Sequence, residues 1–281
     1  MPQVTTRVNG LAVDCIDAGD RGLLYGDGVF ETMAVHDGRV SSWPRHMARL
    51  QAGCKRLGIP GVDTLQLAQE ADVLLAGAGQ CVLKLIVTRG SGGRGYRVPE
   101  EVLPRRILQL LPWPDFPSAA ADAGVAVRLC KARLCHNPRL AGIKHLNRLD
   151  QVLARQEWDD PQIAEGLLLD VDGRLVEGTM SNLFLVRDQR LMTPDLCRCG
   201  VAGIMRSIVL EHAARLSLTV RVQPLDMADL LAAEEVFICN SLVGIWPVSS
   251  IDGRPYRKGA VTIRLQQLIL AEADTGSVWL P

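Results

Sequence analysis

The sequence predicts an α+β protein of two domains, and three features of the chain support that fold class. The 281 residues, 48% of them apolar, exceed the usual length of one domain and can bury a large core. Both halves contain strand-like alternation and apolar residues at helical spacing. Three prolines fall within residues 112–118 and interrupt strand pairing there. We therefore expect an N-terminal domain over residues 1–111, a linker over 112–118 and a C-terminal domain over 119–281.

Two hairpins are expected near the N-terminus. The segment from Val4 to Val13 alternates around Asn9-Gly10, a dipeptide that suits the positive φ angles of a tight turn. Residues 30–35 are strand-like, and Asp37-Gly38 would turn the chain back into a short strand over residues 39–40.

Two helices and two further strands complete the predicted N-terminal domain. Ser42 can cap a helix that accepts a proline in its first turn and stops near Gly58. Asp63 can cap a second helix that runs to Leu75. Strands are expected over residues 82–87 and 106–111.

The C-terminal part also alternates between strands and helices. Asp172-Gly173 suits a hairpin turn between two apolar strands. A helix is expected after Asn147, and another opens at Val201 with an apolar stripe. Further strands are expected over residues 124–130, 167–170, 181–186, 218–222 and 235–239, and further helices over 227–234 and 260–272.

Charge and hydropathy limit the classes of partner. The 31 cationic and 31 acidic side chains give zero formal net charge. The chain therefore has no excess of positive charge of the kind that binds nucleic acid or an acidic membrane surface. No stretch approaches the ~18 uninterrupted apolar residues that a membrane helix needs, and the N-terminus lacks a long apolar segment. We therefore expect a cytoplasmic enzyme with a small-molecule substrate.

The eight cysteines are scattered along a chain that is too long to need disulfide staples, so they are expected to be reduced thiols. Cys197-Arg198-Cys199 resembles half of a zinc site. No second Cys or His pair lies at zinc-site spacing, so no metal site is expected.

A glycine-rich loop raises the alternative of a nucleotide-binding module. Gly90, Gly92 and Gly95 match the spacing Gly-x-Gly-x-x-Gly. A dinucleotide fingerprint must open into a helix, whereas residues 96–104 have the proline pattern of extended chain. The Arg-Gly composition of this run is weak support for RNA binding without a basic domain.

Lys144 is the central candidate for chemistry. Only five of the 31 cationic residues are lysines, and this one follows the apolar residues Ala141, Gly142 and Ile143. Desolvation lowers the pKa of an ammonium group toward the neutral amine that can act as a nucleophile. Spacing alone leaves open the alternative of an exposed lysine at a strand end.

Two separated motifs resemble one known family. The segment from Ala141 to Arg155 and the segment from Glu177 to Phe184 are similar to the lysine region of the fold-type IV pyridoxal-phosphate enzymes, and within them most similar to the aminodeoxychorismate lyases. The resemblance extends over nearly the whole chain. It implies a smaller N-terminal α/β sandwich domain, a larger β-barrel-like C-terminal domain with helices, and a homodimer. It also implies that Lys144 forms the Schiff base with pyridoxal 5'-phosphate.

The resemblance assigns further residues to the cofactor. Arg49 lies in a segment like the one whose arginine binds the phosphate, a task that suits a bidentate guanidinium. Glu177 would lie beside the ring nitrogen, where a carboxylate favours the protonated ring. The resemblance also places Ser181 and Asn182 near the ring, Val201 against its face, and the backbone of Ile204 and Met205 with Ser241 at the phosphate.

The implied activity is conversion of 4-amino-4-deoxychorismate into 4-aminobenzoate and pyruvate, a step of folate synthesis, with Lys144 as general base. Arg94 and Tyr96 lie in a loop that resembles the carboxylate-binding loop of D-amino acid transaminases. Phe30 and Asn147 are expected to contact substrate, and Thr32 to deliver a proton to the leaving group. The competing interpretation is a D-amino acid or branched-chain aminotransferase. Against it, Phe30 stands where D-amino acid enzymes have tyrosine, and Arg148-Leu149 stands where branched-chain enzymes show a tyrosine.

Overall fold

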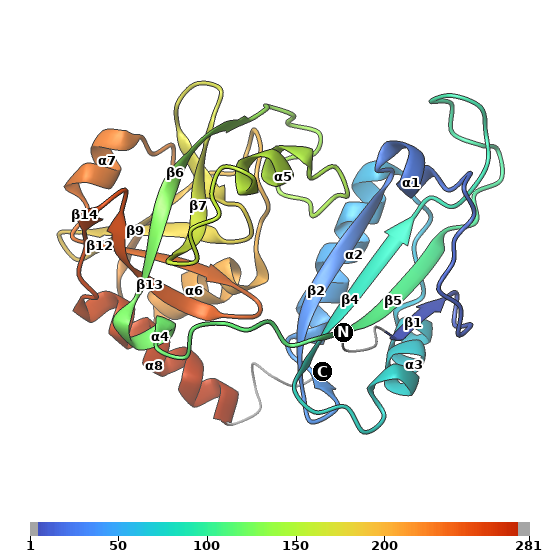
Figure 1. Ribbon diagram of the computed structural model, residues 1–281, viewed down its shortest axis with the longest axis horizontal. Helices are drawn as coiled ribbons and strands as arrows, with labels where there is room; N and C mark the ends of the chain where they lie inside the picture. The colour runs from blue at the N-terminus through green and yellow to red at the C-terminus, as the bar shows by residue number, and fades with distance from the viewer. Residues whose placement is uncertain (1–4, 275–281) are drawn as a thin grey trace. The chain divides into compact units, whose positions relative to one another are not determined.

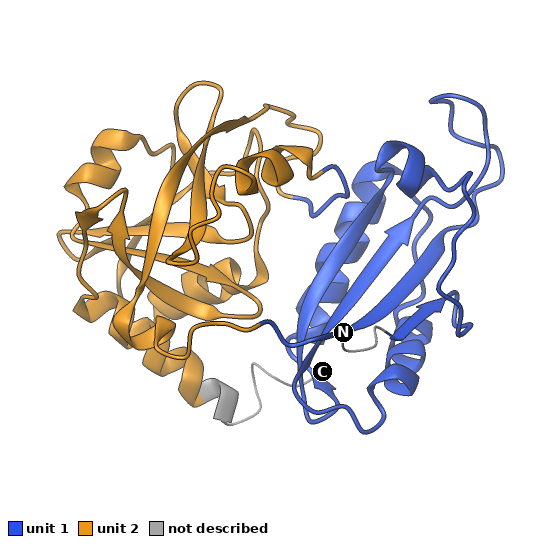
Figure 2. Ribbon diagram, viewed as in Figure 1, with its two compact units in different colours: residues 1–114, 143–147, 278–281 blue, residues 115–142, 148–277 orange. Residues whose placement is uncertain are grey.

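The computed structural model describes residues 5–274, so the predicted strand residue Val4 lies outside the described part. The described chain forms two compact units (Figure 2). Unit 1 contains residues 5–114 and the short segment Ile143–Asn147. Unit 2 contains residues 115–142 and, of the described chain, residues 148–274. The segment that carries Lys144 therefore groups with the N-terminal unit.

Unit 1 is built on a five-stranded antiparallel sheet with the strand order β1-β5-β4-β2-β3. Its strands are β1 (Thr5–Val8), β2 (Gly28–His36), β3 (Arg39–Val40), β4 (Cys81–Thr88) and β5 (Arg105–Pro112). The predicted hairpin at Asp37-Gly38 is confirmed, because β2 pairs with β3 across that turn and Asp37 has a φ of 50°.

Two helices pack on the sheet of unit 1 (Figure 1). They are α2 (Trp43–Leu57) and α3 (Thr64–Leu75), and a short helix α1 (Arg21–Tyr25) precedes β2. Met33 and Leu83 from the sheet share a buried core with Leu50 of α2 and Leu67 of α3, and each is at most 1% exposed. Alternate strand residues and the apolar helix stripes thus bury one common face.

Two local predictions for unit 1 were wrong in part. Asn9-Gly10 forms the tight turn, but no second strand follows it, because the side chains of residues 11–18 are all exposed and have no face to bury. Strand β1 pairs with β5 instead. Ser42 precedes α2 at a φ of 53° and makes no side-chain cap, since capping by serine needs an extended backbone. Asp63 does cap α3 as predicted, accepting from the amides of Leu65 and Gln66.

Unit 2 contains a closed barrel of six strands. The barrel order is β9-β12-β13-β6-β7-β8, and a β8–β9 pairing at Glu177 and Asn182 closes it. Its strands are β6 (Val125–Leu134), β7 (Ile163–Asp170), β8 (Leu175–Gly178), β9 (Asn182–Arg187), β12 (Glu235–Asn240) and β13 (Gly244–Ile251). Strands β10 (Arg190–Pro194), β11 (Thr219–Gln223) and β14 (Arg254–Pro255) extend the same sheet.

Helices flank this barrel, and apolar side chains fill it. The helices are α4 (Ala120–Ala123), α5 (Leu149–Arg155), α6 (Ile204–Arg215), α7 (Met227–Ala232) and α8 (Ala260–Asp274). Leu183, Leu185, Val236 and Ile238 are at most 2% exposed in the barrel core. The α+β class and the barrel-like second part implied by the resemblance are confirmed. Among the described residues, no helix is long and apolar enough to cross a membrane.

Candidate functional site

Lys144 is held against strand β2 in unit 1. The backbone amide of Phe30 donates to the carbonyl of Lys144 at 2.9 Å, and the amide of Leu146 donates to the carbonyl of Gly28 at 3.0 Å. Gly28 permits this packing, because a Cβ there would lie 2.4 Å from the carbonyl oxygen of Val87. The half-buried Lys144 side chain reaches over the Phe30 ring, with Nζ 4.4 Å from the ring centroid. The amine is thus positioned on an aromatic face.

A second lysine lies at the same aromatic ring. The Nζ of Lys84 is 5.8 Å from the centroid of Phe30, and Lys84 is the partner of Thr32 in the β2–β4 ladder. Phe30 and Thr32 are two residues apart on one strand, so their side chains share a face. The structure therefore brings the predicted residues Lys144, Phe30 and Thr32 to one face of the sheet, and adds the unpredicted Lys84.

Arg49 is held by a carboxylate on the opposite face of β2. Glu31 is 1% exposed, and its oxygens accept from Nε of Arg49 at 2.9 Å, from Nη2 of Arg49, and from Nδ1 of His46 at 2.6 Å. Burial alone would raise the pKa of the Glu31 carboxyl, but the Arg49 guanidinium and His46 hold it below its ordinary value. Burial lowers the pKa of His46, and although the hydrogen bond to Glu31 and its charge oppose that shift, the pKa stays below its ordinary value.

We expect Glu31→Gln to reduce the free energy of unfolding by about 3–5 kcal/mol, the usual cost of removing one partner from a buried ion pair. The substitution leaves the Arg49 guanidinium without its charged acceptor. Urea unfolding of the two proteins measures the loss. Glu101→Gln, which changes an exposed carboxylate of the same unit, is the control and should alter stability by less than about 0.5 kcal/mol.

The same pair predicts a pH dependence. Since the folded pKa of Glu31 is depressed, its stabilising contribution is present above the ordinary value of 4.5 and is lost as pH falls through the lowered value. Glu31→Gln lacks this loss, so the stability difference between wild type and variant should shrink in acid. A difference that stays constant down to the acid transition would contradict this role for Glu31.

Arg94 and Tyr96 lie on an anchored loop of unit 1. Both side chains are exposed, Tyr96 by 85%, and the Tyr96 ring meets Tyr25 edge-on at 5.4 Å. The buried Arg21 donates through Nη1 to the carbonyl of Gly95 at 3.1 Å. Arg21 thus holds the loop backbone in place, while the side chains of the two predicted substrate residues are exposed. The next element along the chain is strand β5 rather than a helix, whereas a dinucleotide fingerprint opens into a helix.

Asn147 uses its side chain within unit 1. Its Nδ2 donates to the carbonyl of Gly26 at 3.0 Å. Gly26 has a φ of 65° and no room for a side chain there, because a Cβ would lie 2.8 Å from Oδ1 of Asn147. This carboxamide therefore fixes the turn that leads into β2.

Glu177 is a buried carboxylate of unit 2. It lies on β8 and is 4% exposed. Its Oε2 accepts from the amide of Val201 at 2.8 Å, and its Oε1 accepts from Nε2 of Gln151 at 3.4 Å. Burial lowers the pKa of Arg148, and the charge of Glu177 opposes that shift. The carboxylate is thus oriented by a backbone amide and lies within the field of a buried guanidinium.

Asn182 fixes the segment that enters α6. Its Nδ2 donates to the carbonyl of Val201 at 2.9 Å, and its Oδ1 accepts from the amide of Gly203 at 3.1 Å. Gly203 is the N-cap of α6 and offers no side chain to the first amides of the helix, which belong to Ile204 and Met205. Such amides favour an anion, above all a phosphate.

Ser181 and Ser241 lie in turns shaped by their neighbours. The Ser181 hydroxyl donates to Oε2 of Glu165 at 2.8 Å, and the buried Glu165 also accepts from the amides of Thr179 and Met180. The hydroxyl of Ser181 is therefore engaged in holding its own turn. Ser241 follows Asn240, whose Oδ1 accepts from the amides of Leu242 and Val243 and so defines the β12–β13 turn.

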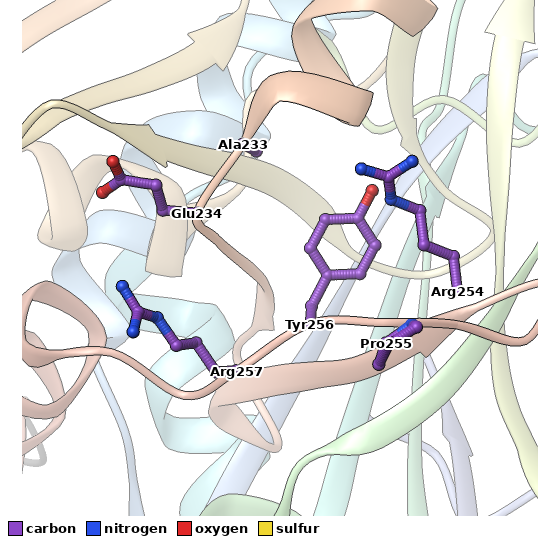
Figure 3. Close-up of a pocket in the computed structure, with 6 residues that line it drawn as sticks. All are labelled: Ala233, Glu234, Arg254, Pro255, Tyr256 and Arg257. Carbon is purple, nitrogen blue, oxygen red and sulfur yellow. The ribbon is translucent and has the colours of Figure 1, made fainter.

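A cavity of about 330 Å³ in unit 2 does not involve these residues (Figure 3). It is lined by Ala233, Glu234, Arg254, Pro255, Tyr256 and Arg257. The Tyr256 hydroxyl donates to the carbonyl of Leu230 at 3.0 Å, and Arg254 donates to the carbonyl of Leu231 at 2.8 Å. Both polar groups thus stabilise the packing of α7, and we do not place the function here.

Comparison with known proteins assigns the chain to a family. A family model described as amino-transferase class IV matches residues 28–251. The chain belongs to this family. Aminodeoxychorismate lyase of Vibrio harveyi is 39% identical to it over 267 residues, which cover 92% of this chain and 97% of that protein.

Two further members of the class IV family illustrate its range. The crystal structure of 4-amino-4-deoxychorismate lyase from Pseudomonas aeruginosa matches with a TM-score of 0.92 at 49% identity, covering 96% of this chain and 99% of that one. A putative branched-chain-amino-acid aminotransferase of Methanocaldococcus jannaschii is 34% identical over 272 residues, covering 92% of this chain and 93% of that protein. The predicted resemblance is confirmed, and enzymes of the class IV family depend on pyridoxal 5'-phosphate.

Three side chains with well-defined contacts in this class IV enzyme were missed by the sequence analysis. Lys84 carried the same signal as Lys144, since lysine is rare in this chain. Glu31 and Glu165 each interrupt an apolar strand pattern, and a buried carboxylate in such a place requires partners. That interruption was the signal for both.

Proposed function

We propose that the protein is an aminodeoxychorismate lyase, which converts 4-amino-4-deoxychorismate into 4-aminobenzoate and pyruvate with pyridoxal 5'-phosphate as cofactor. The observation that carries the proposal is the Lys144 amine held 4.4 Å from the Phe30 ring on the face that also bears Thr32 and Lys84. The lyases of Vibrio harveyi and Pseudomonas aeruginosa, at 39% and 49% identity, support it.

The donor set fits a phosphorylated aldehyde with a basic ring nitrogen. In unit 1, Lys144 supplies the amine and Arg49 a permanently charged group for the phosphate, with Glu31 fixing its guanidinium. In unit 2, the amides of Ile204 and Met205 suit the phosphate, and the buried Glu177 suits a protonated ring nitrogen. Ser241 is a further phosphate ligand in this proposal, Val201 packs on the ring, and Ser181 and Asn182 shape its surroundings. When bound, the cofactor supplies an electron sink for a carbanion.

The chain's own groups then carry the protons. The neutral Lys144 amine removes the proton from the amine-bearing carbon of the substrate. The neighbouring carbon–oxygen bond breaks, and Thr32 delivers a proton to the departing oxygen. The leaving group is then the enol of pyruvate, which tautomerises to pyruvate. Aromatisation of the ring drives the elimination. Lys84 places a positive charge at the Phe30 face, as a substrate with carboxylates requires, and Arg94, Tyr96 and Asn147 complete the proposed substrate contacts.

The decisive assay compares two reactions of the holoenzyme. With 4-amino-4-deoxychorismate we expect equal amounts of 4-aminobenzoate and pyruvate. With D-alanine or a branched-chain amino acid and 2-oxoglutarate we expect much slower amino transfer. Fast transamination without release of 4-aminobenzoate would overturn the lyase assignment in favour of the aminotransferase alternative.

A role in folate synthesis and a cytoplasmic homodimer belong to the same proposal. All eight cysteines are free thiols, in keeping with a reducing compartment. Leu23 and Leu24 of α1 are 62% and 53% exposed, and apolar surface of this kind is what a second copy covers in symmetric dimers. Sedimentation velocity that finds only monomer at assay concentrations would remove the dimer from the proposal.

A further inference from the structure

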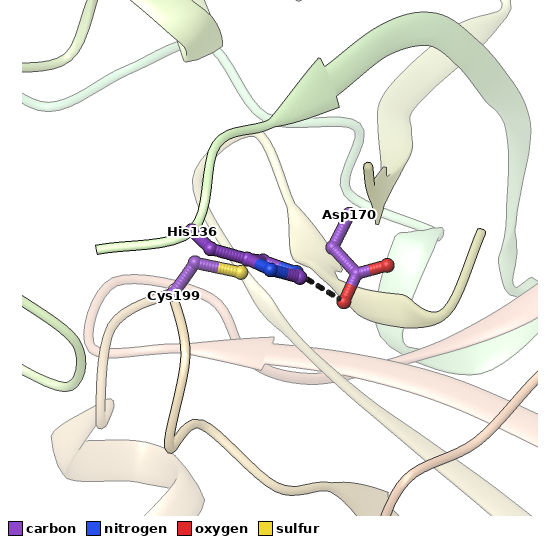
Figure 4. A group of neighbouring side chains, drawn as sticks. All are labelled: His136, Asp170 and Cys199. Carbon is purple, nitrogen blue, oxygen red and sulfur yellow. Dashed lines mark hydrogen bonds and ion pairs between the residues drawn. The ribbon is translucent and has the colours of Figure 1, made fainter. Parts of the chain in front are cut away.

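Three potential metal ligands from distant segments converge in unit 2 (Figure 4). His136 follows β6, Asp170 ends β7, and Cys199 lies in the loop between β10 and α6. Their ligand atoms all lie within 4.8 Å of one another, and Nε2 of His136 is 2.9 Å from Oδ2 of Asp170. In Figure 4 the imidazole lies between the thiol and the carboxylate, and the dashed line marks its contact with Asp170.

The distances suit a tetrahedral ion. Zinc bonds of about 2.0 Å to nitrogen and oxygen and about 2.3 Å to sulfur place neighbouring ligand atoms roughly 3.3–3.6 Å apart. The observed limit of 4.8 Å and the contact of 2.9 Å lie on either side of that range, so small side-chain shifts would suffice. Imidazole, carboxylate and thiolate together form a donor set of borderline softness, which is typical of zinc.

We propose that His136, Asp170 and Cys199 form a zinc-type metal site. The ion bonds to Nε2, Oδ2 and Sγ, and water takes the fourth position. Binding releases the thiol proton of Cys199 to solvent, because a coordinating thiol is deprotonated. One carboxylate and one thiolate then balance the two charges of the ion.

The surroundings of Asp170 and Cys199 support this site. Oδ1 of Asp170 accepts from the amides of Asp172 and Arg174 at 3.0 and 2.8 Å, which directs Oδ2 toward the other two ligands. A cavity of about 20 Å³ beside Asp170 and Cys199 has room for one small ion or one water. Of the two arginines that line it, Arg198 is paired with Asp172 at 2.7 Å.

The proposed ion would stabilise the loop of residues 198–201, which orients Glu177. The amide of Asn137 donates to the carbonyl of Arg198, and the amide of Gly142 donates to the carbonyl of Gly200. The next residue of that loop, Val201, donates its amide to Glu177. His136 and Cys199 thus lie on two segments that these backbone bonds already join, and Asp170 at the end of β7 completes the site. All three ligands are positioning residues, and the site touches no reacting group.

Titration of the holoenzyme with cobalt(II), a spectroscopic substitute for zinc, tests the site without reference to activity. We expect the visible bands of tetrahedral cobalt with a thiolate ligand, and their displacement by zinc. Cys199→Ala and His136→Ala should each weaken cobalt binding by more than about tenfold. Cys197→Ala is the matched control, because its exposed thiol instead donates to Asp195, and binding should be unchanged.

Thermal unfolding with and without zinc keeps the test valid if a variant is less stable. Zinc should raise the Tm of wild type and of Cys197→Ala, and should leave the Tm of Cys199→Ala where it is without metal. The proposal is overturned if cobalt gives no tetrahedral bands, or if Cys199→Ala binds cobalt as wild type does. Because neither readout uses catalysis, failure of this site leaves the proposed lyase activity untouched.

Discussion

Lys144→Ala should abolish formation of 4-aminobenzoate, with a loss in kcat on the order of 10⁴-fold or more. The amine of this residue is the base of the proposed reaction and the group to which the cofactor attaches. Its position above the Phe30 ring is set by the β2 backbone bonds to residues 144 and 146, and those bonds do not depend on the side chain. The variant should therefore fold. Product release measured by fluorescence or chromatography, together with the visible spectrum of the purified protein, checks the prediction.

Two variants separate the nucleophile from the charge. Lys144→Arg places a permanent cation at the Phe30 ring but has no amine that can release its proton near neutral pH, so it should be as inactive as Lys144→Ala. Lys55→Ala removes an exposed lysine of α2 and should keep wild-type rate and spectrum. Borohydride reduction of wild type should fix the cofactor on the peptide that contains residue 144. Attachment at residue 84 instead would refute the role assigned here to Lys144.

Elements with local causes could be predicted from the sequence, whereas elements with long-range causes could not. Asp63 caps α3 with its own side chain, and Asp37-Gly38 closes a hairpin between adjacent strands. Strand β13 was missed because Pro247 has no amide and argues against a central strand. In the structure Pro247 pairs with Phe237 of β12 across the turn that Asn240 defines, and the other edge of β13 pairs with β6, which lies more than 100 residues earlier in the chain. The segment after Asn9-Gly10 is the opposite case. The local turn forms as predicted, but the residues that follow it are exposed and form no second strand.

The same division applies to the candidate site. Lys144 was identifiable because it is a rare lysine after apolar residues that prove to be buried. Glu31 contacts His46 and Arg49, which lie 15 and 18 residues later in the chain. These contacts require α2 to pack on β2, so no local sequence pattern predicts them. The group of His136, Asp170 and Cys199 was missed for the same reason. A search for paired ligands at fixed spacing cannot find three ligands that come from three segments.

Glu177→Gln should lower kcat by roughly 10- to 10³-fold and leave KM nearly unchanged. A carboxylate within hydrogen-bond reach shifts the pKa of a cationic partner by about 1–3 units, and each unit is a factor of ten between protonated and neutral forms. The neutral amide forfeits that preference for a protonated ring nitrogen and thus weakens carbanion stabilisation. Steady-state kinetics with the substrate deuterated at the amine-bearing carbon checks this, because the isotope effect should grow as proton removal becomes slower.

The size of the Glu177 effect should come from charge rather than from a disturbed fold. The glutamine carbonyl can still accept the 2.8 Å bond from the Val201 amide, so the loop before α6 should keep its position. Cofactor content and Tm should therefore match those of wild type. A variant that destabilised β8 would instead lower both. Glu234→Gln, which neutralises an exposed carboxylate of the same unit, should leave both kcat and the isotope effect as they are. An unchanged kcat in Glu177→Gln would mean that this carboxylate only orients the loop and does not face the ring nitrogen.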